Sequence, residues 1–479
     1  MKSKGKVLFI VHDLYQEDNH LPLGVAYMGA VLKKWGIEVE VYCQDVFHYS
    51  NQELASYLLK DDYDLIGVGF MAARFNETIV DLCSTINQGK KDAWLVLGGH
   101  GPSPIPDYVL KKTGADVVVI GEAEETIVEL LQCKIEGGDL SQIKGIAFKT
   151  VEEITVNERR KPIRKLDSIP FPEWSLFPME KYTTCLSLFR KDIGDRILGI
   201  LTSRGCVNRC NFCYRMEKGI RFRSIENVVE EMRILKNNYG VNYFHMQDEL
   251  FIASKKRIIE FHESLKKNNL NIKFASNARV DIFDEELASC LKECGCQFLN
   301  FGMESSDQSV LNLMNKNTTV EENIKAAVIT KKVDIGLGLN FIWGNIGDTE
   351  ESLKNNVKLI KEYNTYDQLR TIRPVTPYPG CDLYYEAIKR RLLSGPEDFF
   401  NKFRNSDLLL VNFTDIPENE FYKMLFEANK ELILDHFSHT TKNMEQAHAL
   451  INDFQNLYFG NKVKFRGARH YDAAGCNPS

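Results

Sequence analysis

The chain has 479 residues, a length that predicts two or three domains rather than one core. Hydrophobic residues make up 44% of it and charged residues 26%, a balance that excludes a disordered or fibrous protein. The formal net charge is −6 and no stretch is dense in lysine and arginine, which excludes a protein that binds polymeric nucleic acid through its phosphates.

The start of the chain contains an apolar run at residues 7–11 that is interrupted by His12 and Asp13. This run is too short for a signal-peptide core or a membrane span, so we expect a cytoplasmic protein. Its twelve cysteines should stay reduced there, which favours metal binding or catalysis over disulfides. Cys290 is predicted to be an ordinary buried side chain, and the pair Cys294 and Cys296 indicates no site by its spacing.

Residues 6–131 alternate short apolar runs with amphipathic stretches. This alternation predicts an α/β domain in which five parallel strands are joined by helices, a doubly wound, Rossmann-like sheet. The predicted strands are KVLFIV, EVEVY, LIGVGF, WLVLGG and DVVVIG. A ligand of such a sheet binds beyond the carboxyl ends of the strands, so we expect it at residues 13–24, 71–76, 98–103 and 121–125.

A hairpin and the proline-containing stretch DSIPFPEWSLFP follow, and we interpret them as a linker. Six further strand-helix units predict an open, partial (β/α)6 barrel whose active site faces the carboxyl ends of its strands. A helical run from Pro417 to Phe437 predicts a small, mostly helical cap. The expected order is a Rossmann-like domain at 1–145, the hairpin and linker at 146–192, the barrel at 193–394 and the cap at 395–479.

Three cysteines, Cys206, Cys210 and Cys213, form the C-x3-C-x2-C motif CVNRCNFC directly after the apolar strand ILGILTS. Three soft thiolates suit an iron-sulfur cluster, in which they leave one iron open. An open iron can bind the amino and carboxylate groups of S-adenosylmethionine. The alternative is a zinc knuckle, which needs a fourth cysteine or histidine.

With Phe212 before its last cysteine, this motif resembles the signature of the radical S-adenosylmethionine (SAM) superfamily. The segments HMQDELF, SNAR, GMESSD, NFIWGNIGDTEE and TPYPGCDLY resemble later motifs of that superfamily and arrive in its order. The resemblance implies a [4Fe-4S] cluster that cleaves SAM reductively to a 5′-deoxyadenosyl radical. The SAM-binding residues that it implies are Phe212, Tyr214, Gln247, Asp248, Glu249, Arg279, Glu304, Ser305, Phe341, Trp343 and Gly344.

The segments PLGVAYMGAVLKKWG, GGHGPSP and GEAEET before the barrel resemble the B12-binding radical SAM proteins, which include anaerobic magnesium-protoporphyrin monomethyl ester cyclase and the class B methylases. This resemblance implies that cobalamin lies over the first sheet. The D-x-H-x-x-G motif of other cobalamin proteins is broken here by one residue, so we expect no bond from His20 to cobalt. The implied cobalamin-binding residues are Leu23, Gly24, Met71, Ala72, Ala73, Arg74, Phe75, Asn76, Gly98, Gly99, His100, Gly101, Gly121 and Glu122.

The expected function is that of a cobalamin-dependent radical SAM methyltransferase acting on an unactivated carbon of a small-molecule substrate. The expected partner is a one-electron reductant such as flavodoxin or ferredoxin. Alternatives are a radical SAM cyclase, dehydratase or rearrangement enzyme with a different or vestigial cobalamin role, and a non-catalytic metal-binding module. Tyr378 and Tyr384 are candidates for the substrate pocket, with ordinary packing beneath the cap as the alternative.

Overall fold

The computed structural model describes residues 5–14, 19–72, 75–150, 153–185, 192–404 and 406–460. These residues form two compact units. The first contains the described residues up to 185 together with 395–401, and the second contains 192–394 together with 402–460. Among the described residues, no helix combines the length and the apolar character that crossing a membrane requires.

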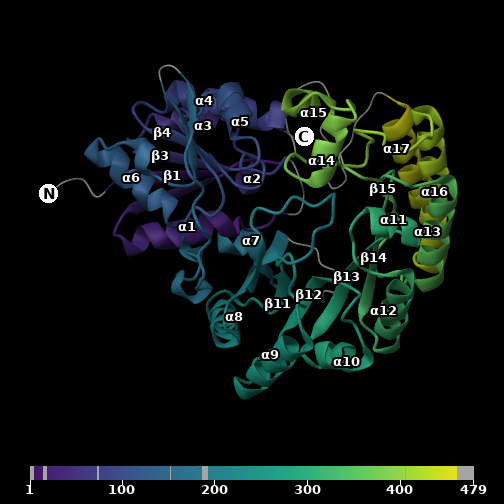
Figure 1. Cartoon of the computed structure of the whole chain (residues 1–479). Coiled ribbons are helices and arrows are strands. Elements are labelled where there is room, and N and C mark those ends of the chain that lie inside the picture. The colour runs from purple at the N-terminus through teal and green to yellow at the C-terminus, as the bar shows by residue number, and fades with distance from the viewer. Residues whose placement is uncertain are drawn as a thin grey trace. The chain divides into compact units, whose positions relative to one another are not determined.

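The first unit is built on one mixed sheet of seven strands in the order β2-β1-β3-β4-β5-β6-β7 (Figure 1). The first five strands pair in parallel. The four inner ones are largely buried and almost purely apolar, whereas β2 at the edge carries two glutamates. These five strands are β1 (Lys6–Val11), β2 (Glu38–Cys43), β3 (Leu65–Gly69), β4 (Trp94–Gly98) and β5 (Val117–Val119). The hairpin of β6 (Ile146–Lys149) and β7 (Ile154–Val156) extends this sheet in antiparallel pairing.

Helices cover both faces of this sheet, as the doubly wound pattern predicts. α1 (Leu23–Lys34) packs with α6 (Thr126–Glu136), whereas α4 (Val80–Gly89) packs with α3 (Asn51–Leu58) and α5 (Pro106–Thr113). The short helices α2 (Gln44–Phe47) and α7 (Met179–Cys185) and the later helix α15 (Pro396–Lys402) complete the set. The strand order reverses between β1 and β3, and the predicted ligand loops surround that point.

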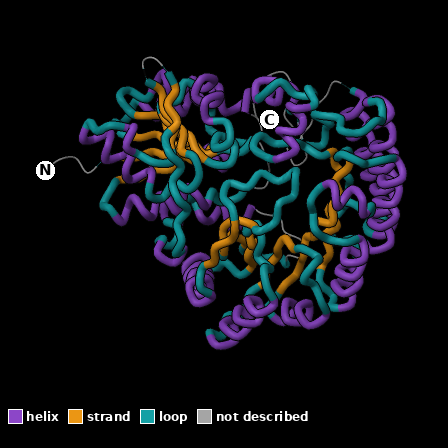
Figure 2. Tube along the Cα trace, viewed as in Figure 1, coloured by secondary structure: helices purple, strands orange, loops and turns teal. Residues whose placement is uncertain are grey.

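The second unit contains a parallel sheet of six strands in the order β15-β14-β13-β12-β11-β8. Its edges are β8 and β15, so the sheet is an open half barrel, and its helices lie on the outer side (Figure 2). This confirms the predicted partial barrel. The strands are β8 (Ile197–Ile200), β11 (Tyr243–Met246), β12 (Lys273–Ala278), β13 (Cys296–Glu304), β14 (Gly336–Trp343) and β15 (Arg373–Pro374).

Side chains that cap helix N-termini set the boundaries between these strands and helices. Ser224, Ser254, Asp284, Asp307 and Thr319 each accept a hydrogen bond from a backbone N–H in the first turn of the helix that follows. The helices of the barrel are α8 (Ile225–Tyr239), α9 (Lys255–Lys267), α10 (Glu285–Glu293), α11 (Gln308–Leu313), α12 (Val320–Lys332) and α13 (Glu350–Tyr363).

Helices dominate the C-terminal region, as the sequence predicts. They are α14 (Asp382–Lys389), α16 (Glu418–His439) and α17 (Met444–Phe459), and α16 packs against both α13 and α17. Buried Asn429 of α16 accepts a hydrogen bond from the N–H of Ile372 at 2.8 Å and donates one to its carbonyl at 3.0 Å. The Asn429 amide thus satisfies the backbone N–H and carbonyl of Ile372, just before β15, as a neighbouring strand would do in a sheet.

Candidate active site

The three motif cysteines lie on a hairpin that follows β8. Cys206 ends β9 (Ser203–Cys206), which pairs antiparallel with β10 (Gly219–Phe222), and Cys210 and Cys213 lie in the connection between the two strands. Gly205 has φ +87°, and a Cβ there would lie 2.4 Å from the carbonyl oxygen of Gly219. Only glycine therefore permits this close approach beside the first cysteine.

Backbone contacts with later segments hold the cysteine loop in place. The N–H of Asn211 donates to the carbonyl of Met314 at 2.9 Å, and its side-chain amide donates to that of Leu313 at 3.0 Å. The carbonyl of Asn211 accepts from the N–H of Leu383 at 2.8 Å. All three cysteines are free thiols, and residues 206–219 contain no fourth cysteine and no histidine. This donor set fits a cluster with one open iron better than a zinc knuckle.

Buried Asp248, at the end of β11, fixes the base of the hairpin. Its carboxylate accepts hydrogen bonds from the N–H of Thr202 at 3.0 Å and from the hydroxyls of Thr202 and Ser203. Burial raises the pKa of this carboxyl, and the same hydrogen bonds oppose the rise. The structure thus gives Asp248 a positioning role beside the cysteines, whereas its predicted contact with SAM stays a prediction.

Two further residues of the predicted SAM set flank Asp248. The side-chain amide of Gln247 lies across Gly199 of β8, where a Cβ would come within 2.4 Å of it. Gln247 is half-buried and Glu249 is exposed. Phe212 and Tyr214 are likewise half-buried, within and next to the cysteine loop.

Glu304, at the end of β13, has an uncommon backbone conformation for a residue with a side chain. Its φ is +65°, and the register between β13 and β14 shifts between Gly302 and Glu304. Its buried carboxylate accepts a hydrogen bond from Nζ of Lys316 at 2.8 Å. A Cβ at residue 302 would lie 2.4 Å from Oε1 of Glu304, so Gly302 makes room for this ion pair.

Charged side chains gather beside Cys210. Burial raises the pKa of the Cys210 thiol, the cations of Lys316 and Arg279 lower it, and the Glu304 carboxylate raises it. Arg279 donates to the carbonyl of Lys316 at 3.0 Å. The structure therefore brings the predicted residues Arg279 and Glu304 to the second motif cysteine. It adds Lys316, which sequence reasoning missed because the turn NKNTT matches no motif.

Trp343 and Gly344, at the end of β14, are held by hydrogen bonds and ring stacking with other parts of the chain. Trp343 is fully buried, donates from Nε1 to the carbonyl of Thr349 at 3.0 Å and stacks on Phe421 with ring centroids 4.1 Å apart. The N–H of Gly344 donates to Asp348 at 3.0 Å, and burial raises the pKa of that carboxyl to about 6. The predicted adenine contact near these residues, including buried Phe341, stays a prediction.

Ser305, Tyr378 and Tyr384, three further predicted site residues, each contact residues close to them in sequence or in the fold. Ser305 is fully buried, and its hydroxyl accepts from the N–H of Asp307 at 3.1 Å at the start of α11. Tyr384 is buried and packs edge-on against Tyr385, at 5.5 Å between ring centroids. Tyr378 is half-buried and its ring lies 5.8 Å from that of Phe403. The predicted place of Tyr378 and Tyr384 in a substrate pocket stays a prediction.

A row of asparagines crosses three neighbouring strands of the half barrel. Asn300 donates to Asn277 at 3.1 Å, and Arg370 donates to Asn300 at 3.2 Å and to Asn340 at 3.0 Å. Burial lowers the pKa of Arg370 to about 9. Sequence reasoning missed this row, although an asparagine inside each of the apolar strands KFASN, FLN and GLGLN was a visible signal.

In the first unit, the glycines of the predicted cobalamin set bring the strand-end loops together. Gly99 has φ +103°, and a Cβ at Gly101 would lie 2.7 Å from the ring of Phe70 and 2.8 Å from the carbonyl of Met71. The N–H of Gly121 donates to the hydroxyl of Ser103 at 3.2 Å. The loops after β3, β4 and β5 therefore meet, with Gly98 ending β4, and they form a cradle in which side chains would clash.

The loop after β3 divides into an exposed part and a packed part. Met71 is 67% exposed and Ala72 is half-buried. Phe75 is buried with its ring 4.5 Å from that of Phe400, and the amide of Asn76 donates to the carbonyl of Phe400 at 3.1 Å. The predicted residues Ala73 and Arg74 lie outside the described residues.

The remaining members of the predicted cobalamin set occupy varied surroundings. Leu23 is buried whereas Gly24 and His100 are exposed, and the carboxylate of Glu122 accepts from the N–H of Ile163 at 2.8 Å. His20, which we expect not to bind cobalt, is exposed.

Several polar residues cluster near the ends of β1 and β2, and of these only Asp13 belongs to a predicted ligand loop. Burial lowers the pKa of His12 to about 4. Asp13 is buried and lies 2.6 Å from Nδ1 of His48. Nearby, Asp45 accepts hydrogen bonds from the hydroxyl of Tyr182. These residues place titratable groups at the same edge of the first sheet as the predicted ligand loops.

Two family models match the chain where the two sites lie. Residues 200–360 match the Radical SAM superfamily, and residues 16–131 match the B12 binding domain. The fold and the sites thus define a radical SAM enzyme that carries a cobalamin-binding domain.

Relatives cover most of the chain. It is 30% identical to an uncharacterized methyltransferase of Pyrococcus horikoshii over 87% of this chain and 90% of that protein. It is 28% identical to the anaerobic magnesium-protoporphyrin IX monomethyl ester cyclase of Rubrivivax gelatinosus over 80% of this chain and 70% of the cyclase. The chain belongs to the B12-binding radical SAM family, whose cofactors are a [4Fe-4S] cluster, SAM and cobalamin.

A solved structure supports the fold. The apo structure of the cobalamin-dependent S-adenosylmethionine radical enzyme OxsB matches 96% of this chain and 76% of its own, with a TM-score of 0.69 at 19% identity. The predicted family, fold and cofactors are confirmed, and the protein is a cobalamin-dependent radical SAM enzyme.

Proposed function

We propose that the protein is a methyltransferase that adds a methyl group to an unactivated carbon of a small-molecule substrate. The similarity to the Pyrococcus horikoshii methyltransferase, which covers nearly all of that relative, supports methyl transfer. The similarity to the Rubrivivax gelatinosus cyclase favours one second candidate, a radical cyclisation.

The loop after β3 carries the proposal. In its described part, Met71 and Ala72 offer an apolar surface without an imidazole, and Met71 is 67% exposed. When bound, cobalamin supplies a methyl carrier and the cluster supplies the electron that cleaves SAM. A lower face without an imidazole favours methyl transfer, because a strong lower ligand opposes the low coordination number of cobalt that accepts a methyl group.

The residues near Cys210 have complementary tasks in this proposal. The three cysteines hold the cluster, and Lys316 and Arg279 place positive charge beside it. Glu304 offers a buried carboxylate oxygen to the ammonium group of SAM, in the manner of a charge-assisted hydrogen bond. The asparagine row of the half barrel offers amide groups to a polar part of the substrate.

The two candidates differ in the products that they make from SAM. Anaerobic incubation with hydroxocobalamin, a one-electron reductant and SAM labelled in its methyl group should give both S-adenosylhomocysteine and 5′-deoxyadenosine. S-adenosylhomocysteine should disappear when cobalamin is omitted. A cyclase would form 5′-deoxyadenosine alone, and that result would overturn the methyltransferase proposal.

Matched cysteine variants separate the cluster from general damage to the fold. Cys210→Ala should abolish 5′-deoxyadenosine formation while the protein stays folded. Cys83→Ala removes a buried thiol of α4 in the first unit and should retain both products. Unchanged 5′-deoxyadenosine formation by Cys210→Ala would contradict the assignment of the cluster ligands.

A further inference from the structure

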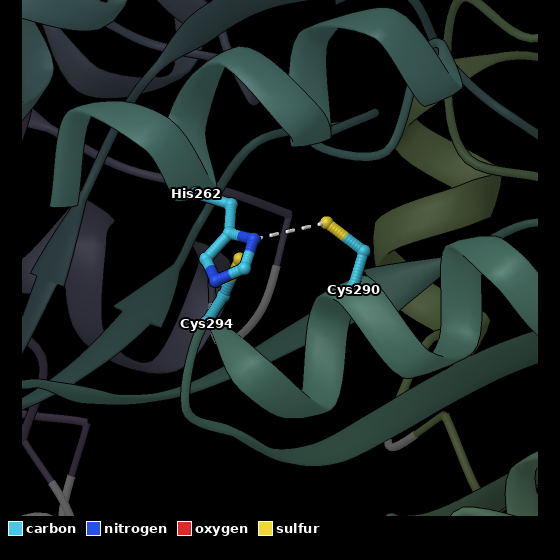
Figure 3. Close-up of side chains that lie close together, drawn as sticks. All are labelled: His262, Cys290 and Cys294. Atoms are coloured by element: carbon cyan, nitrogen blue, oxygen red, sulfur yellow. Dashed lines mark hydrogen bonds between the residues drawn. The ribbon is translucent and has the colours of Figure 1, made fainter. Parts of the chain in front are cut away.

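A second group of metal-ligating side chains lies between two outer helices of the half barrel (Figure 3). His262 belongs to α9, Cys290 belongs to α10, and Cys294 follows α10 at its C-cap. One ligand atom from each residue lies within 4.8 Å of those of the other two. None of the three belongs to the segments that resemble radical SAM motifs.

The helix explains why these particular residues meet. Cys290 and Cys294 are four residues apart, so they lie on the same face of α10. α9 and α10 pack together, and Nδ1 of His262 faces the sulfur of Cys290, while the sulfur of Cys294 lies behind the imidazole ring in this view (Figure 3). Cys296, two residues further on, lies in β13 and is not a member of the group.

The separation of two of these donor atoms matches that in a tetrahedral zinc site. Nδ1 of His262 lies 3.7 Å from Sγ of Cys290. Zinc bonds of about 2.3 Å to sulfur and about 2.05 Å to nitrogen, at a tetrahedral angle, separate the two donors by about 3.6 Å. Nδ1 of His262 and Sγ of Cys290 thus already have the separation that zinc would need, and Sγ of Cys294 lies within 4.8 Å of both.

The second nitrogen of His262 has the surroundings of a metal-bound imidazole. Nε2 is buried and has no hydrogen-bond partner within the part of the chain that the structure describes. The nearest acid is Glu293, whose carboxylate oxygen lies 3.5 Å away. A histidine that binds metal through one nitrogen commonly turns the other toward a carboxylate, which fixes its orientation.

We propose that His262, Cys290 and Cys294 bind one zinc ion, with water as the fourth ligand. Nδ1 and the two sulfurs are the protein ligands, and Glu293 orients the imidazole through Nε2. Zinc binds thiolates, so each of the two thiols releases its proton to solvent when the ion binds. The ion joins α9 to α10 and is separate from the cluster held by Cys206, Cys210 and Cys213.

Metal analysis of the full-length, cluster-loaded protein tests this proposal. After equilibration with zinc under reducing conditions and removal of loosely bound metal, the wild type should retain one more zinc per chain than Cys290→Ser/Cys294→Ser. The iron content of the two proteins should be equal. Cys296→Ser, the matched control from the same segment, should retain the zinc.

A second variant covers the case in which the double substitution disturbs folding. Glu293 is largely exposed, so Glu293→Gln should fold normally and weaken zinc binding by roughly 10- to 100-fold. Equal zinc content in the wild type and the double variant would overturn the proposal.

Discussion

The ammonium group of Lys316 lies 2.8 Å from the carboxylate of Glu304, and only 7% and 11% of the two side chains are exposed. Glu304 also has φ +65° at an irregularity in the pairing of β13 with β14. A buried ion pair and an unfavourable backbone conformation both cost free energy of folding. Their coincidence beside Cys210 is typical of a site that is shaped for binding.

Breaking this ion pair should destabilise the second unit. Lys316→Met leaves the buried Glu304 carboxylate without its cation, and we expect the free energy of unfolding to fall by about 3 kcal/mol or more. Adding Glu304→Gln removes the unpaired charge and should restore part of the loss. Urea unfolding of the wild type, the two single variants and the double variant gives the coupling energy of Lys316 and Glu304. If the two single effects simply add in the double variant, the ion pair is not formed.

Glu304 should matter for SAM more than for the cluster. Glu304→Gln keeps the shape of the side chain but removes its charge, so SAM affinity should fall by roughly tenfold or more. The iron content should not change. Equilibrium dialysis with cluster-loaded protein measures this affinity, and exposed Glu321→Gln of α12 is the control. Wild-type affinity in Glu304→Gln would remove Glu304 from the SAM site.

The hairpin that carries the cysteines should tolerate a methyl group at one glycine and not at the other. Gly205 and Gly219 have φ of +87° and +81°, so alanine is strained at both. A Cβ at 205 meets the carbonyl oxygen of Gly219 at 2.4 Å, whereas a Cβ at 219 meets nothing within 4 Å. Gly205→Ala should therefore lose most of its iron after reconstitution, and Gly219→Ala should retain it. Similar iron contents would show that the hairpin adapts.

Much of the architecture could be predicted because local signals agree with the final fold. Most of the parallel strands are apolar runs, and residues such as Ser224 and Asp307, placed between them, cap the next helix. Hydrophobic periodicity and N-caps are properties of neighbouring residues, which a sequence shows directly. The cluster motif could be predicted for the same reason, because Cys206, Cys210 and Cys213 fall within eight consecutive residues.

The missed residues depend on distant segments. Arg370 reaches Asn300 and Asn340 only because the strand register places Asn300 opposite Gly338 and Gly302 opposite Asn340. Lys316 meets Glu304 through the turn after α11. Register and turn geometry come from tertiary packing, so no local pattern predicts these contacts.

The group around His262 illustrates the same limit. Along the chain, the cysteine nearest to Cys294 is Cys296, and their spacing predicts no site. Helical spacing instead pairs Cys294 with Cys290, and the packing of α9 on α10 supplies the histidine.

The first unit should lose stability as the pH rises from about 4 to about 7, because of Asp45. Burial raises the pKa of this carboxyl to about 7, against the opposing effect of the Tyr182 hydroxyl. An acid whose pKa is raised by folding stabilises the fold fully below its unfolded pKa of about 3.9, and that stability is lost as the pH rises to 7.

Asp45→Asn cannot ionise and should therefore be more stable than the wild type at pH 8. This advantage should shrink by about 2 kcal/mol at pH 5.5. Urea unfolding followed by tryptophan fluorescence measures it, since Trp35, Trp94 and Trp174 all lie in the first unit. Exposed Asp81→Asn of α4 should follow the wild type at both pH values, and an advantage of Asp45→Asn that does not vary with pH would contradict the pKa.

Cobalamin should bind with its lower face over the loop after β3 and with no histidine on cobalt. His20 is exposed and its motif spacing is broken, whereas half-buried Ala72 lies beside exposed Met71, where loops after neighbouring strands meet. A large side chain at 72 would fill that surface, so Ala72→Trp should weaken cobalamin binding by tenfold or more. His20→Ala should bind like the wild type and give the same electron paramagnetic resonance spectrum of bound cob(II)alamin. Nitrogen superhyperfine splitting that is present in the wild type and lost in His20→Ala would show that His20 is the ligand, and unimpaired binding by Ala72→Trp would place cobalamin elsewhere.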